Sequence, residues 1–260
     1  MWFEIMILTI LGLAMVLQVL AQHVYLRGAL EGVLRPMRLP TYPSISVIRP
    51  IKGLDAGAWD NIAAALDHGY PGKVETLFVL DDEQDPSYPL VLEALERHRK
   101  MHMPGTVSAL LCGPPAPGLT GKLNAMIAGL EQSNNELIVF ADSDIRPDRD
   151  GLRVLVETVM SSRRAGSAFT PVYAVLPTRT VGDAGYALLL NGLYGSAAAA
   201  AARRRGGEMP FIMGQFMVFR REAIAAIGGL ESARGQLVDD MYLGARVEAA
   251  GYKNLVSPHP

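Results

Sequence analysis

Four strand-and-helix units follow one another between residues 44 and 159, and this alternation limits the possible fold more than any other feature. Short apolar runs predict strands at 44–49, 74–80, 107–111 and 136–141. Apolar residues at helical spacing predict helices at 59–68, 87–100, from Gly121 onward and at 152–159. Strands that alternate with helices form a mostly parallel sheet with helices on both faces. We therefore expect an α/β fold with a Rossmann-like sheet.

A long apolar segment precedes this pattern. Trp2 to Leu20 contains Glu4 and Gln18 as its strongly polar residues. At about 1.5 Å per residue the segment makes a helix of roughly 28 Å, close to a hydrocarbon core of about 30 Å. A cleaved signal peptide is the alternative, but it normally carries Lys or Arg before its apolar stretch, and here the first is Arg27. We expect a transmembrane anchor at 1–26 and a linker at 27–43.

The basic residues near this segment predict its orientation. Arg27, Arg35 and Arg38 all follow the apolar segment, and no Lys or Arg precedes it. By the positive-inside rule the rest of the chain then faces the cytoplasm from the cell membrane. The composition agrees with a membrane-associated chain, since 19% of its residues are charged, against about 25% in soluble domains.

Charge and cysteine content exclude several classes of function. The net charge of −2 provides no basic field, so we expect no nucleic-acid partner. The single cysteine, Cys112, excludes an intrachain disulfide and a zinc site built on several cysteines. The five histidines form no HExxH pair. Carboxylates remain as the expected metal ligands.

Acidic residues follow two of the predicted strands. Asp82 follows the second strand, and Asp142 and Asp144 follow the fourth. The ligand crevice of an open α/β sheet lies beyond the carboxyl ends of its strands, so these acids can converge there. Turn formation is the alternative, and we adopt it for Asp81, Asp85, Asp148 and Asp150. For Asp-Ser-Asp it is weaker, because two neighbouring acids repel each other unless a divalent cation joins them to a diphosphate.

Two further groups carry possible chemistry. Lys122 opens a predicted amphipathic helix, where it can meet an anionic ligand with the helix dipole behind it. A solvated loop lysine is the alternative. Asp239 and Asp240 begin another predicted helix. Either of them is an N-cap, or the pair holds one partly desolvated carboxylate that accepts a proton.

The ordered set of these motifs resembles an inverting GT-A glycosyltransferase of the family 2 kind. Within that group it most resembles ceramide glucosyltransferases and their bacterial relatives, including those that act on hopanoid lipids. The set adds the segment Gly214–Arg221 and Gly228-Gly229-Leu230 to the acids and lysine. The closer match rests on Ile48-Arg-Pro-Ile-Lys-Gly53, Asp82-Glu-Gln-Asp-Pro86, Gly121-Lys122 and Ala141-Asp-Ser-Asp-Ile-Arg146.

The resemblance implies a GT-A fold and a hexosyltransferase that moves a sugar from a UDP-sugar to the hydroxyl of a membrane lipid of the ceramide or hopanoid type. Asp82 would contact the uracil, and Lys122 would lie close to the nucleotide. Asp142 would lie by the ribose and the metal, and Asp144 would hold Mg²⁺ or Mn²⁺ against the diphosphate.

The resemblance also assigns the catalytic acids. Asp240 would be the general base that deprotonates the acceptor hydroxyl, which gives inversion in one displacement. Asp239 would cap the helix or support its neighbour.

One motif of the family is absent from the sequence. The family places (Q/R)xxRW after the base, whereas the two tryptophans here are Trp2 and Trp59. We therefore expect residues 44–260 to be a GT-A domain whose C-terminal part is missing. Two alternatives stay open, a catalytically inactive truncated domain and a nucleotidyltransferase. A nucleotidyltransferase normally has a glycine-rich, basic phosphate loop near the first strand, and Arg49-Pro-Ile-Lys-Gly53 is a poor version of it.

The segment from Asp183 to Ala202 allows two interpretations. It is rich in small residues and ends in three arginines, Arg203 to Arg205. One interpretation is a helix packed within the domain with a solvated basic end. The other is a helix at the bilayer surface, with the arginines among lipid headgroups and the apolar part at the entry of the acceptor.

Overall fold

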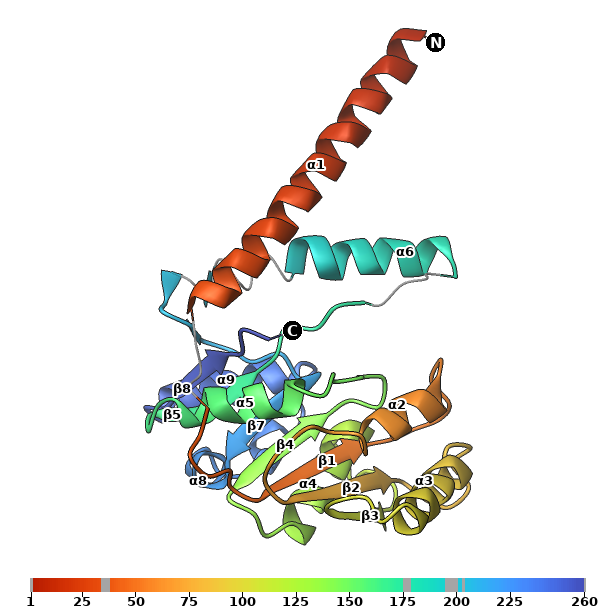
Figure 1. Cartoon of the computed structure of the whole chain (residues 1–260), viewed down its shortest axis with the longest axis vertical. Helices are drawn as coiled ribbons and strands as arrows, with labels where there is room; N and C mark the ends of the chain where they lie inside the picture. The colour runs from red at the N-terminus through yellow and green to blue at the C-terminus, as the bar shows by residue number, and fades with distance from the viewer. Residues whose placement is uncertain (1, 34–37, 175–178, 195–200, 203, 260) are drawn as a thin grey trace.

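The centre of the fold is a mixed sheet in the order β3-β2-β1-β4-β7-β5-β8-β6 (Figure 1). The computed structural model describes residues 2–33, 38–174, 179–194, 201–202 and 204–259. The strands are β1 (Ile45–Pro50), β2 (Val74–Leu80), β3 (Thr106–Leu111), β4 (Leu137–Ala141), β5 (Ala165–Phe169), β6 (Glu208–Met209), β7 (Phe216–Arg220) and β8 (Lys253–Val256). The first four agree closely with the ranges predicted from the sequence.

The sheet is parallel in its first half and mixed in its second. Strands β3, β2, β1 and β4 pair in parallel, as predicted. Strand β7 lies antiparallel between β4 and β5, β8 pairs in parallel with β5, and β6 closes the edge in the antiparallel sense. The expected α/β fold with a mostly parallel sheet is confirmed, with β7 and β6 as the reversed strands.

Helices cover both faces of the sheet. They are α2 (Ala58–Ala64), α3 (Tyr88–Lys100), α4 (Gly121–Gln132), α5 (Gly151–Met160), α8 (Arg221–Ala226) and α9 (Asp239–Ala249), with a 3₁₀ turn η2 (Leu230–Ala233). Residues that alternate along the strands face opposite cores. Ile48 and Phe140 pack with side chains of α4, α8 and α9, whereas Val47 and Val139 pack with α5. A third cluster joins α2 and α3 to Phe78 and Leu80 of β2.

Helix α4 lies close against the sheet, which places its N-terminus at the carboxyl ends of β1 and β4. Thr120 caps the helix by accepting a hydrogen bond from the Leu123 amide at 3.1 Å. A Cβ at Gly129 would lie 2.5 Å from the Ile48 side chain, so glycine permits the close approach. The first residues of α4, including Lys122, are thereby fixed near the end of β4.

Helix α1 (Trp2–Val33) projects away from the sheet, and α6 (Val181–Leu188) lies beside it (Figure 1). α1 continues beyond the predicted anchor into the predicted linker. It approaches the π-helical turn η1 (Leu189–Tyr194), since a Cβ at Gly192 would lie 3.4 Å from the Val19 side chain. In the part of the chain that the structure describes, no helix is both long and apolar enough to cross a membrane.

The segment predicted as one helix from Asp183 to Ala202 is divided in the structure. α6 ends at Leu188 and continues as η1, which widens the helical turn. Thr180 and Asp183 form a capping box at the start of α6. Residues 195–200 and Arg203 lie outside the described residues.

Candidate active site

Arg49, at the end of β1, holds the loop that follows β4. Its guanidinium is 1% exposed, and one amino group donates hydrogen bonds to the carbonyl oxygens of Asp142 at 2.8 Å, Ser143 at 3.3 Å and Ile145 at 2.9 Å. Burial lowers the pKa of Arg49 to about 10, while the nearby charges of Asp142 and Asp144 raise it. Arg49 therefore stays charged at neutral pH beneath the acidic loop.

Lys122 pairs with the first acid of this loop. Its ammonium nitrogen lies 2.5 Å from Asp142 Oδ1 and 3.3 Å from the carbonyl oxygen of Gly214. Burial raises the pKa of Asp142; the charge of Lys122 lowers it, and the charges of Asp144 and Asp240 raise it. Asp142 thus lies in a half-buried cluster in which carboxylates outnumber cations.

The second pair of acids reaches this cluster from α9. Asp240 Oδ2 accepts a hydrogen bond from the amide of Gly214 at 2.6 Å. A Cβ at Gly214 would lie 2.8 Å from that same oxygen, so a larger residue would displace the carboxylate. Burial raises the pKa of Asp239, the nearby Lys122 lowers it, and Asp240 raises it. Asp239 therefore lies in the electrostatic field of Lys122, and the charge of Asp240 acts on Asp142.

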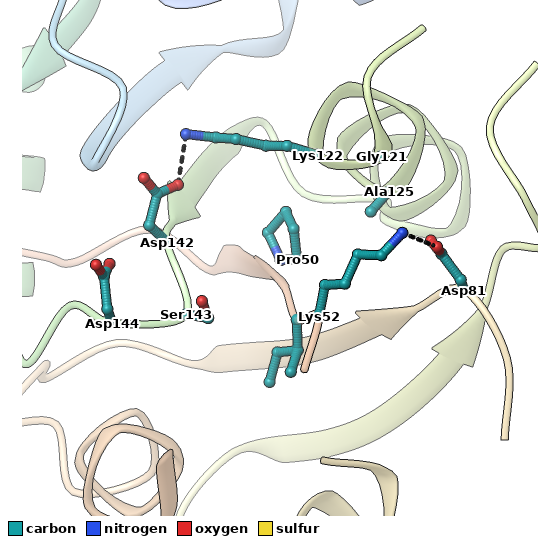
Figure 2. A pocket seen from close by; sticks show the side chains of 10 residues that line it. Pro50, Lys52, Asp81, Gly121, Lys122, Ala125, Asp142, Ser143 and Asp144 are labelled. Atoms are coloured by element: carbon teal, nitrogen blue, oxygen red, sulfur yellow. Dashed lines mark hydrogen bonds and ion pairs between the residues drawn. The ribbon is translucent and has the colours of Figure 1, made fainter. Parts of the chain in front are cut away.

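A cavity of about 260 Å³ opens beside these groups. Figure 2 shows Asp142 and Asp144 on one side of it and the ion pair of Lys52 with Asp81 on another, 2.7 Å between Nζ and Oδ2. The lining residues are Pro50, Ile51, Lys52, Asp81, Gly121, Lys122, Ala125, Asp142, Ser143 and Asp144. The carboxyl ends of β1, β2 and β4 and the start of α4 all contribute, as the topology predicts.

The structure brings together most of the residues selected from the sequence. Lys122, Asp142 and Asp144 line the cavity. Asp240 is joined to Lys122 through Gly214, and its neighbour Asp239 lies within reach of the charge of Lys122.

Asp82 does not line the cavity, although the sequence predicts that it converges there with Asp142 and Asp144. Its side chain is exposed and accepts a hydrogen bond from the Gln84 amide at 2.7 Å, which is turn formation. Its neighbour Asp81, for which the sequence favours turn formation, lines the cavity instead. Lys52 also lines the cavity but is not among the residues selected from the sequence; its position two residues after Pro50, where the strand ends, is the available signal.

The donor set fits a metal ion that is bound together with a substrate. Among the described residues, no group of three or more His, Cys, Asp or Glu side chains is placed to hold a metal. Asp142 and Asp144 offer two carboxylates from one loop. Mg²⁺ in nucleotide enzymes is commonly held by one or two carboxylates, with phosphate oxygens and water completing its ligands. The residues present fit that mode and not an all-protein cage.

Comparisons with known proteins agree with this geometry. The model of the family described as glycosyl transferase family 21 matches residues 5–260. Ceramide glucosyltransferase 3 of Caenorhabditis elegans is 26% identical over 84% of this chain and 45% of its own length. Ceramide glucosyltransferase 1 of the same organism is 23% identical over 85% of this chain and also 45% of its own length. The chain thus spans about half the length of the curated relatives it matches.

A solved structure shares the fold. The mannosyltransferase PcManGT from Pyrobaculum calidifontis, in complex with GDP-Man and Mn²⁺, superposes with a TM-score of 0.61 at 18% identity. The match covers 95% of this chain and 64% of that one. This similarity supports the GT-A type of fold.

Replacement of Arg49 tests its role in the site. Arg49→Met leaves three part-buried carbonyl groups without their donor, so we expect a loss of about 3 kcal/mol in the free energy of unfolding. Arg149→Met is the control, because this exposed arginine of the same loop pairs at 3.8 Å with the exposed Asp67. It should cost below about 1 kcal/mol. Denaturant unfolding in detergent measures both, and equal losses would contradict this role for Arg49.

Proposed function

Since the chain belongs to glycosyltransferase family 21, we propose that it transfers a sugar from a UDP-sugar to the hydroxyl of a membrane lipid of the ceramide or hopanoid type, with inversion. The observation that carries the proposal is the convergence of Asp142, Asp144 and Lys122 with Asp240 at the carboxyl end of the parallel strands. The similarity to the two ceramide glucosyltransferases supports the lipid acceptor.

The cavity is assigned to the donor nucleotide. Lys122 at the start of α4 faces the diphosphate, where its charge and the helix dipole both favour an anion. Asp142 and Asp144 would hold the divalent cation, Mg²⁺ or Mn²⁺, and the cation would supply positive charge against the diphosphate. We assign the contact with the uracil to Asp81 in place of Asp82, because Asp81 lines the cavity and Asp82 does not.

Asp240 is assigned as the base that takes the proton of the acceptor hydroxyl. The Gly214 amide fixes one oxygen of its carboxylate at 2.6 Å, and the Met241 amide fixes the other at 2.7 Å. An oriented carboxylate on the face of the sugar opposite the leaving diphosphate gives a single displacement with inversion. Asp239 supports it through its bond from the Asp240 amide at 2.8 Å.

The structure argues against the nucleotidyltransferase alternative, because the segment Arg49–Gly53 is not arranged as a phosphate loop. A phosphate loop needs backbone and basic groups that are free to meet the triphosphate. Arg49 is instead buried under the acidic loop, and the Gly53 amide is bound by Asp85 at 2.9 Å. The Arg49 guanidinium and the Gly53 amide are therefore already bound within the protein.

Nucleotide binding should depend on a divalent cation. Two carboxylates without a third protein ligand hold a metal weakly, so the metal and UDP should bind together. We expect calorimetry to show UDP binding with Mn²⁺ that is at least about tenfold tighter than with EDTA. Asp144→Ala should remove most of that difference. Equal UDP affinity with and without metal would contradict the assignment of Asp142 and Asp144 as metal ligands.

Asp81→Ala and Asp82→Ala form the matched control for the same titration. Asp81→Ala should weaken UDP binding, whereas Asp82→Ala should leave it close to the unmodified value. A larger loss of UDP affinity in Asp82→Ala than in Asp81→Ala would assign the uracil contact to Asp82.

Sugar transfer should depend on Asp240. Asp240→Asn keeps the oxygen that accepts from Gly214 but cannot take a proton, so transfer to ceramide should fall by about 10²–10⁴-fold. UDP binding should persist. Asp239→Asn should have a smaller effect. Radiolabelled transfer from UDP-glucose or UDP-N-acetylglucosamine measures the rate, and unchanged turnover in Asp240→Asn would place the base elsewhere.

We further propose that α1 attaches the chain to the cell membrane, with the sheet on the cytoplasmic side. The described side chains from Trp2 to Leu17 are all exposed, and Trp2 reaches 80%. In α6, Val181 and Tyr186 are exposed as well. Apolar surface of this extent is unfavourable in water and is satisfied by lipid. The arginines that follow the apolar segment support the orientation.

Carbonate extraction tests this attachment. We expect the chain to stay with the membrane pellet. The double variant Leu8→Asp with Leu11→Asp should move to the supernatant, because the transfer of charged side chains from water to lipid is unfavourable. Leu54→Asp with Leu92→Asp, at exposed positions outside α1, should stay in the pellet. Extraction of the unmodified chain would refute the attachment.

A further inference from the structure

Three exposed, large apolar side chains lie close in sequence to the proposed base, at the start of α9. Leu237 is 96% exposed, Val238 is 49% exposed and Met241 is 45% exposed. They flank Asp239 and Asp240 in the sequence, and Val238 is the N-cap of α9. We call these three residues the apolar ledge. Such a group of exposed apolar side chains beside a functional carboxylate requires an explanation.

Packing within the protein does not account for the ledge. An apolar residue just before an N-cap commonly packs against the fourth residue of its helix. Here that pair would be Leu237 with Tyr242, yet Leu237 is almost fully exposed and Tyr242 packs against the core instead. Val238 and Met241 are three residues apart, so both side chains lie along one side of the first turn.

The polarity of this first turn is divided. Asp240 faces inward, where it is bound by Gly214 and lies near Lys122. The ledge faces outward and carries no charge. A molecule that contacts both must therefore present a polar group to Asp240 and an apolar part to the ledge.

A second apolar segment borders the ledge. The loop before α4 exposes Pro114, Pro115 and Pro117. It is joined to the chain before α9 by a bond from Arg234 to the Pro117 carbonyl at 2.5 Å, and by one from the Gly235 amide to the Gly118 carbonyl at 2.8 Å. These bonds keep the proline loop beside the segment that leads into Leu237.

We propose that the apolar ledge binds the hydrocarbon part of the lipid acceptor next to the hydroxyl that Asp240 deprotonates. The proposal rests on the proposed function and adds residues that select the acceptor. The donor cavity is lined by other residues, so the ledge affects the acceptor and leaves the nucleotide unaffected. Its apolar contacts favour an acceptor with long chains over a short, water-soluble alcohol.

The kinetic test compares Leu237→Ser with Leu92→Ser. Leu92 is 44% exposed on α3, at the opposite end of the sheet from α9 (Figure 1). Leu237→Ser should raise the KM for long-chain ceramide by about tenfold or more, with a much smaller change in kcat. The effect should shrink as the acceptor chain is shortened, and Leu92→Ser should leave the KM unchanged. An unchanged KM in Leu237→Ser, or an equal rise in Leu92→Ser, would overturn the proposal.

A labelling test gives a readout that does not require turnover. Cys112 is the single cysteine of the chain, so Cys112→Ser allows a polarity-sensitive fluorophore to be attached at Leu237→Cys or, as control, at Leu92→Cys. The probes are phosphatidylcholine vesicles with and without ceramide. Emission from position 237 should shift to the blue when ceramide is present, and emission from position 92 should not. An equal shift in both kinds of vesicle would mark a general bilayer contact and overturn acceptor binding, as would no shift at all.

UDP calorimetry on the same labelled proteins separates the two proposals. If UDP binds with Mn²⁺ but the emission shows no ceramide-dependent shift, acceptor binding by the apolar ledge is refuted and the proposed sugar transfer is not. A ceramide-dependent shift without UDP binding supports the ledge as a lipid site and refutes the proposed sugar transfer.

Discussion

The buried guanidinium of Arg49 is the interaction on which the candidate site depends. Charged groups leave water at a high cost, and this one recovers part of it through three carbonyl oxygens of the loop after β4. Because those carbonyls turn inward, the carboxylates of Asp142 and Asp144 are presented to the cavity. The same charge reduces the repulsion between the two acids. Arg49 thus both positions the acidic loop and reduces the repulsion between its two carboxylates.

Gly214 connects the nucleotide side of the site to the acceptor side. Its amide binds Asp240, and its carbonyl accepts a hydrogen bond from Lys122. The next residue, Gln215, accepts from the Asp142 amide through its carbonyl at 2.9 Å. A movement of this short segment would shift the proposed base, the lysine and the metal-binding loop together. The two proposed sides of the site are therefore joined through the entry to β7.

The sequence allowed prediction of those parts of the fold that local patterns determine. Strands β1 to β4 and the helices between them follow apolar periodicity, and Asp142 and Asp144 were found because they come directly after a buried strand. The strands β5 and β7 are short, and β7 depends on antiparallel partners far away in the sequence, so no local pattern marks its place in the sheet. Asp81 and Asp82 differ by one position at a strand end, where a single residue changes the direction of the side chain. The structural role of Arg49 was missed because arginine is rarely buried unless it is paired.

The insertion of β7 between β4 and β5 has a consequence for biosynthesis. A ribosome releases β1 to β4 first, and these four strands can pair as soon as they emerge. The acidic loop then still lacks the Gln215 carbonyl that holds the Asp142 amide, and β4 lacks its neighbour on that side. Asp240 emerges later still. A nascent chain therefore carries an acidic loop that Arg49 already holds but that still lacks its contact with β7, and the site is complete only when the second half of the sheet has closed against the first.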